Sequence, residues 1–75
     1  MSRLRKRSVL VSGHQTSVSL EQEFWDELAD HAAARNLSVN ALISEIDGAR
    51  EPGVNLSSSL RVHVLEALRA RAAED

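Results

Sequence analysis

Apolar residues recur at helical spacing in three segments of the chain, which predicts three amphipathic helices. The first covers residues 21–35, and its early acidic side chains suit the positive end of the helix dipole. The second begins after Ser38, whose side chain can cap its first turn. The third, capped by Asn55 or Ser57, follows residues 51–54, where proline and glycine break the chain. The three apolar stripes are Phe24, Trp25, Leu28, Ala29 and Ala32; Val39, Leu42, Ile43 and Ile46; and Leu56, Leu60, Val64 and Leu68, widened by Val62 and Leu65.

A short segment before the first helix alternates apolar and polar residues, which is the pattern of a half-buried strand. Val18 and Leu20 fall on its apolar face. The polar face consists of Gln15, Ser17 and Ser19. One isolated strand cannot satisfy its own backbone hydrogen-bonding groups. The pattern therefore predicts that residues 16–20 of two chains pair into an antiparallel ribbon.

The strand and helices follow one another in the order of a known fold. The likeness rests on GHQTSVSLEQEFWDEL, LSVNALISEID and NLSSSLRVHVL, which span roughly residues 8–68. In these segments the chain resembles the ribbon-helix-helix superfamily of bacterial and phage repressors, to which MetJ and Arc belong, and within it a subgroup of short bacterial proteins with an extra C-terminal helix. The resemblance implies a mainly α fold with one short β-strand, built as an intertwined homodimer with a two-stranded antiparallel intersubunit ribbon.

The resemblance also implies a transcriptional repressor whose ribbon enters the major groove of double-stranded DNA. The residues that would face the groove are Gln15, Ser17 and Ser19. The start of the second helix would hold a phosphate, because free backbone N–H groups and the helix dipole attract an anion there. The residues of that turn are Ser38, Val39 and Asn40. Serine hydroxyls both donate and accept hydrogen bonds and so discriminate bases poorly, whereas typical ribbons of this kind carry Arg, Lys, Asn or Gln.

The formal net charge of −2 hides a strong asymmetry along the chain. Residues 1–7 carry four basic groups and no acidic one, while the rest of the chain carries five basic groups against eleven acidic ones. The basic cluster would supply most of the attraction to DNA phosphates. Its members are Arg3, Arg5, Lys6 and Arg7. We expect a flexible basic arm over residues 1–7, a ribbon-helix-helix domain over 8–50, and a turn and C-terminal helix over 51–75; residues 8–12 could be a short strand or part of an extended arm.

Other classes of function find little support in the sequence. The chain has no cysteine for a disulfide or a thiolate nucleophile, no glycine-rich phosphate loop, and no recognisable catalytic constellation, so we expect no enzyme and no cofactor. Its three histidines are too far apart for a local metal motif, so we expect no metal. Because a secretory signal and a membrane-spanning stretch are both missing from the pattern, we expect a cytoplasmic protein.

Several interpretations stay open from sequence alone. The C-terminal helix could pack on the dimer, join dimers into a tetramer, or grip another protein in an antitoxin-like interaction module, and a small-ligand-responsive oligomer is a further alternative. The basic cluster could be a solubilising tail, and the strand serines a solvated face. Ser38 could act only as a cap. His14 could touch phosphate, titrate or fill a turn, and Arg61 could bind an anion or form a structural ion pair, which we favour.

Overall fold

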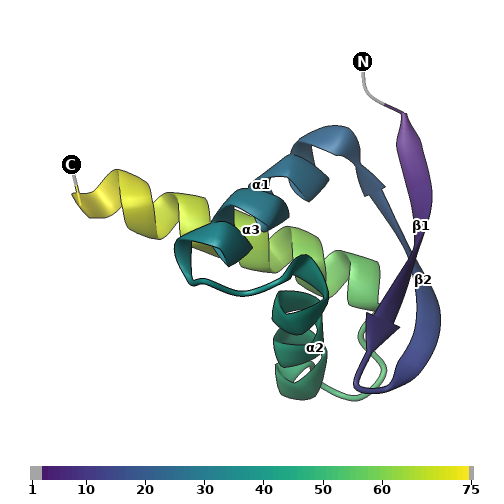
Figure 1. The fold of residues 1–75 in the computed structure, drawn as a ribbon. Helices are drawn as coiled ribbons and strands as arrows, with labels where there is room; N and C mark the ends of the chain where they lie inside the picture. Colours follow the sequence, from purple (N-terminus) through teal and green to yellow (C-terminus); the bar gives the residue numbers. More distant parts are fainter. Residues whose placement is uncertain (1–2, 75) are drawn as a thin grey trace.

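The computed structural model describes residues 3–74 and contains a two-stranded sheet and three helices (Figure 1). The strands come first, and the first helix follows the second strand without a loop. The third helix crosses behind the first and extends past it toward the C-terminus (Figure 1). The elements are β1 (Leu4–Val11), β2 (His14–Glu21), α1 (Gln22–Ala34), α2 (Val39–Ala49) and α3 (Leu56–Glu74). The predicted mainly α ribbon-helix-helix order is confirmed.

The two strands form an antiparallel hairpin within one chain. Their register places Ser8 opposite Ser17. The connecting residues Ser12 and Gly13 both have positive φ, 51° and 84°. Two such residues in succession form the kind of tight turn whose twist matches that of the flanking strands.

The prediction of a single short strand is therefore wrong, because the chain contains two strands. Residues 8–11, whose pairing was left open, belong to β1, and so do residues 4–7 of the expected arm. We expected two chains to pair because the backbone N–H and C=O groups of β2 need hydrogen-bond partners. That need is met by β1 of the same chain, so hydrogen bonding alone does not require an intersubunit ribbon.

One face of the hairpin packs against the helices. Val9 and Val11 of β1 and Val18 and Leu20 of β2 are at most 5% exposed. They form one apolar cluster with members of all three predicted helical stripes, whereas Val62, Leu65 and Leu68 of the third stripe are exposed. The buried helical members are Leu28, Ala32, Leu42, Ile43, Ile46, Leu60 and Val64. All five elements thus contribute side chains to the core, and this allows so short a chain to form a hydrophobic core.

The helix ends follow the local signals in the sequence. The Ser38 side chain accepts a hydrogen bond from the Ala41 N–H at 3.0 Å and so caps α2. The Asn55 side chain accepts one from the Ser58 N–H at 3.1 Å at the start of α3. Asn36 has a φ of 58°, the left-handed conformation that ends a helix. Within residues 3–74, no helix is both long enough and apolar enough to span a bilayer.

The contact between α1 and α3 contains two imidazoles. The rings of His31 and His63 meet edge to face with centroids 5.0 Å apart. The Nε2 atom of His63 is buried without a hydrogen-bond partner. Burial lowers the pKa of His63 below its ordinary value, and the neighbouring His31 lowers it further. The native protein therefore favours the neutral form of His63.

Replacing Val18 by aspartate should unfold the protein. Val18 is 1% exposed in an apolar cluster, and an unpaired carboxylate there costs more than a small domain can offset. Loss of the helical circular dichroism signal would show it. The control is Ser17→Asp, one residue earlier on the exposed face, which should keep the signal. A folded Val18→Asp variant would contradict the assignment of the inward face.

Stability should fall as the pH drops below about 6.5, the ordinary pKa of histidine. Because the pKa of His63 is lowered in the folded protein, the unfolded chain binds a proton at a higher pH than the folded chain does. The stability that the neutral His63 contributes is therefore complete above about pH 6.5 and decreases as the pH falls toward the folded-state pKa. Urea midpoints between pH 7.5 and 5.5 would measure this. His63→Gln should flatten the dependence, whereas His14→Gln, at the exposed end of β2, should leave it in place. Equal slopes in both variants would contradict the role of His63.

Candidate nucleic-acid interface

The face of the hairpin that points away from the helices is exposed and mostly polar, with Leu10 as an exposed apolar residue on it. Residues directly opposite each other in an antiparallel pair share a face, so the pairing of Lys6 with Ser19, Ser8 with Ser17 and Leu10 with Gln15 defines it. All of these except the half-buried Ser19 are exposed. We call Lys6, Ser8, Leu10, Gln15 and Ser17 the outward face. It contains two of the three residues predicted to face the groove and adds three from β1.

Ser19, the third predicted groove residue, is held by α3. Its N–H donates to the Ser57 hydroxyl at 3.0 Å, and its carbonyl accepts from the Arg61 guanidinium at 3.1 Å. Arg61 also pairs with Glu21 at 3.1 Å. The predicted structural ion pair of Arg61 is thus present, and its acid comes from the same chain. The pKa of Glu21 lies below its ordinary value, because the carboxylate accepts a backbone hydrogen bond and, in addition, one from Arg61.

The basic cluster is divided between the two faces of the hairpin. Lys6 lies on the outward face, whereas Arg5 and Arg7 lie on the other, opposite Leu20 and Val18. Arg3 precedes β1, and it is exposed, as are Arg5 and Lys6. These three cations are in contact with solvent, which suits attraction to phosphates.

Arg7 is the exception, because it packs against α1. Its guanidinium carbon lies 4.5 Å from the ring centroid of Trp25, and its Nη2 donates to the Gln22 side chain at 2.9 Å. Its Nε atom is buried without a partner. A cation stacked on an indole and hydrogen-bonded is a structural contact between strand and helix. Trp25 itself is half-buried against the core, as its place in the first predicted apolar stripe indicates.

The start of α2, which was predicted to hold a phosphate, is a capped helix N-terminus. Ser38 uses its side chain to cap Ala41, while Val39 packs against the core and Asn40 is exposed. In the described structure, the N–H groups of Val39 and Asn40 have no hydrogen-bond partner, as at any helix start. In the described part of the chain, no hydrogen bond or ion pair joins this turn to the outward face of the hairpin.

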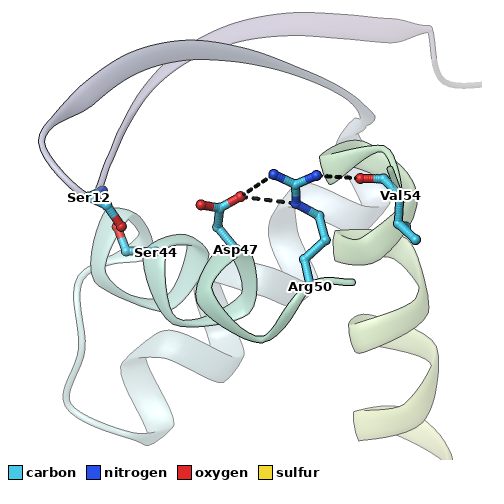
Figure 2. A network of polar contacts seen from close by, with 5 residues as sticks. All are labelled: Ser12, Ser44, Asp47, Arg50 and Val54. Atoms are coloured by element: carbon cyan, nitrogen blue, oxygen red, sulfur yellow. Dashed lines mark hydrogen bonds and ion pairs between the residues drawn. The ribbon is translucent and has the colours of Figure 1, made fainter. Parts of the chain in front are cut away.

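The hairpin reaches α2 farther along, at its turn (Figure 2). The Ser12 N–H donates to the Ser44 hydroxyl at 3.1 Å. Near the end of the same helix, the Arg50 guanidinium donates two bonds to Asp47 at 2.8 and 3.0 Å and another to the Val54 carbonyl. Figure 2 shows these contacts fixing the hairpin turn on one side and the connection to α3 on the other. They orient the outward face relative to the helices.

Other kinds of site are not formed by the residues that the structure describes. Among residues 3–74, no group of three histidine, cysteine or acidic side chains could hold a metal ion. Sequence reasoning missed β1 as a contributor to the outward face. The available signal was the dipeptide Ser12-Gly13 between two segments rich in β-formers, which is a hairpin signature.

Comparison with known proteins agrees with this geometry. A family model described as a ribbon-helix-helix domain matches residues 4–68. Among solved structures, an uncharacterized protein from Bordetella pertussis Tohama I is similar, with a TM-score of 0.83, 35% sequence identity and coverage of 97% of this chain. This chain spans 62% of the length of that protein. A search of curated proteins gave no match.

The matched segment contains the hairpin, the two following helices and most of α3. It therefore includes the outward face and the start of α2 together. The chain belongs to the ribbon-helix-helix domain family, whose members are non-enzymatic regulators that bind DNA as dimers.

Proposed function

We propose that this protein is a transcriptional repressor that inserts the β1–β2 hairpin into the major groove of DNA. The observation that carries the proposal is the outward face, a mostly polar surface on a two-stranded ribbon with exposed cations at its open end. A ribbon of two strands has the width that the major groove admits. Here one chain supplies both strands, so the intersubunit ribbon expected from sequence is replaced in this proposal by an intrachain one.

The residues of the outward face divide into two roles. The amide of Gln15 can form a bidentate contact with adenine, while Ser8 and Ser17 can accept or donate to several bases. Lys6 can reach guanine or a phosphate. Arg3 and Arg5 supply sequence-independent attraction to the backbone. A protein with these partners works where the genome is, which in a bacterium is the cytoplasm.

The start of α2 is proposed as a phosphate anchor. Its support is the capped first turn, the free N–H groups of Val39 and Asn40, and the helix dipole. Ser38 serves as the cap in either case, so an alanine variant would confuse stability with binding. A substitution that keeps the cap and changes only the charge separates the two effects.

A second candidate function, a protein-interaction module, is favoured by one feature of α3. Val62 and Leu65 are both 51% exposed and Leu68 is 40% exposed along that helix. An exposed apolar stripe of this kind can dock against another helix. Polar substitution of these three residues would abolish partner binding in that case and leave DNA binding unchanged in the repressor.

Removing the charges of Arg5 and Lys6 should weaken binding to all DNA sequences. Each lost phosphate contact lowers the slope of log affinity against log salt by about one. We would titrate Arg5→Gln/Lys6→Gln against random and selected duplexes at several salt concentrations. The matched control is Arg69→Gln/Arg71→Gln, which removes the same charge from exposed positions near the end of α3. Equal loss in both variants would show a net-charge effect without a specific role for the hairpin. Arg7 is kept because it supports the fold.

Ser38→Asp should preserve stability and reduce DNA affinity. Aspartate caps a helix about as well as serine, but its carboxylate would repel a phosphate at the same turn. Ser38→Asn, an equally good and neutral cap, is the control and should bind DNA as the parent does. Thermal unfolding and duplex binding at one salt concentration would measure both quantities. Unchanged affinity of the aspartate variant would remove α2 from the interface.

A further inference from the structure

A groove runs along the flank of α1 that faces α3. It consists of two hollows, of about 390 Å³ and about 230 Å³, which share the lining residues Glu27, Val64 and Leu68. Along α1 the lining runs from Glu23 through Glu27 to Ala34, at spacings of four and seven residues that repeat on one face of a helix. The two hollows therefore form one continuous groove, about 16 Å long, which is the length of three helical turns. We call it the α1–α3 groove.

The floor of the α1–α3 groove is apolar. Phe24 of α1 and Val64 and Leu68 of α3 line one hollow, and Ala67 continues the floor into the other. Val64 belongs to the core and is 3% exposed, whereas Leu68, one turn later, is 40% exposed. Leu65, three residues before Leu68, is 51% exposed and extends the apolar surface past the groove. An exposed apolar surface with a polar rim is typical of a protein-interaction site.

The rim of the groove is acidic. Four carboxylates line it, and Arg71 is the only lysine or arginine among its described lining residues. The four acids are Glu23, Asp26, Glu27 and Asp30. Within residues 3–74 no salt bridge uses Asp26, Glu27 or Asp30, and the hydrogen bond that Asp26 accepts at 2.8 Å comes from the neutral amide of Gln22. The fold therefore leaves most of this negative charge uncompensated.

The spacing of these acids makes the charge unfavourable for the helix itself. Glu23 and Glu27, like Asp26 and Asp30, are four residues apart on α1, where like charges repel each other. The helix dipole favours acids in the first turn, so it does not stabilise Asp30 in the third. Cations placed along this line would remove the repulsion, whereas a phosphate or an acidic peptide would add to it. The chemistry that fits the groove is thus basic beside apolar.

We propose that the α1–α3 groove binds a basic amphipathic helix of another protein. Apolar side chains spaced at i, i+4 and i+7 would cover Leu68 and the floor, which is the way amphipathic helices dock in grooves. Lysine or arginine residues beside that stripe would pair with Glu27 and Asp30. The groove lies between helices, and the outward face of the hairpin points away from them. The inference therefore goes beyond the proposed repressor role and does not depend on it.

The first test uses a synthetic labelled peptide as the probe. Its leucines stand at i, i+4, i+7 and i+11, and lysines flank the leucine stripe. One comparison peptide carries glutamate in place of lysine, and another contains the same residues in scrambled order. Fluorescence anisotropy with the full chain should show binding of the lysine amphipathic peptide alone, and the affinity should fall as salt rises. No binding, or equal binding of the scrambled peptide, would overturn the proposal.

The second test removes the exposed apolar contact. Leu68→Gln should lower the affinity for the lysine peptide by more than about tenfold, as expected for a central contact of an interface. The matched control is Val62→Gln, since Val62 is 51% exposed but lines the hollow between α2 and α3. Both variants should keep the helical circular dichroism signal of the parent. Equal affinities in the two variants would contradict the groove. A parent homodimer that Leu68→Gln dissociates in sedimentation would also overturn the proposal, because a second copy would then occupy the groove.

The third test separates the acidic rim from the net charge. Asp26→Asn/Glu27→Gln should weaken binding of the lysine peptide and reduce its salt dependence. Glu51→Gln/Glu74→Gln removes the same charge from exposed positions outside the groove and is the matched control. Equal losses in both would show a net-charge effect and contradict the proposed site. Leu68→Gln should bind DNA as the parent does, so failure of this inference and failure of the proposed function would be observed separately.

Discussion

The backbone hydrogen bonds of β2 are the constraint on which the rest of this structure depends. A strand directs its backbone donors and acceptors alternately to its two edges, and neither edge can be buried away from water without hydrogen-bond partners. β1 satisfies one edge along the whole strand. Ser57 and Arg61 of α3 satisfy the other at Ser19. The extra C-terminal helix is therefore part of the ribbon's hydrogen bonding as well as part of the core.

The register of the hairpin then determines what each basic residue can do. Side chains alternate between the two faces, so Arg5 and Arg7 fall on the inward side and Lys6 on the outward side. Arg7 is drawn into a stack on Trp25 and a hydrogen bond with Gln22. A cluster that is one block of charge in the sequence becomes, in the fold, three solvent-facing cations and one structural cation. This division weakens any estimate of DNA attraction made from the sequence count alone.

Local signals were sufficient to predict the helices and their ends. Periodicity and the caps at Ser38 and Asn55 depend on residues within one turn of one another. The strand pairing depended on the turn at Ser12-Gly13, a hairpin signal that the prediction of a single strand did not use. The exposure of Gln15 and Ser17 followed from alternation. The partial burial of Ser19 did not follow from alternation, because its carbonyl is bound by Arg61, more than forty positions away in sequence.

A ribbon made within one chain changes how recognition can be built. In an intersubunit ribbon both strands carry the same residues, so its face is symmetric. Here β1 contributes Lys6 and Leu10 while β2 contributes Gln15 and Ser17, so the face of one hairpin is asymmetric and, in the proposed function, would contact one half-site. Serine hydroxyls distinguish bases poorly, which leaves Gln15 as the outward amide able to select adenine. If the hairpin reads DNA as proposed, so few discriminating side chains per chain would leave most of the selectivity to repetition of the outward face on several chains.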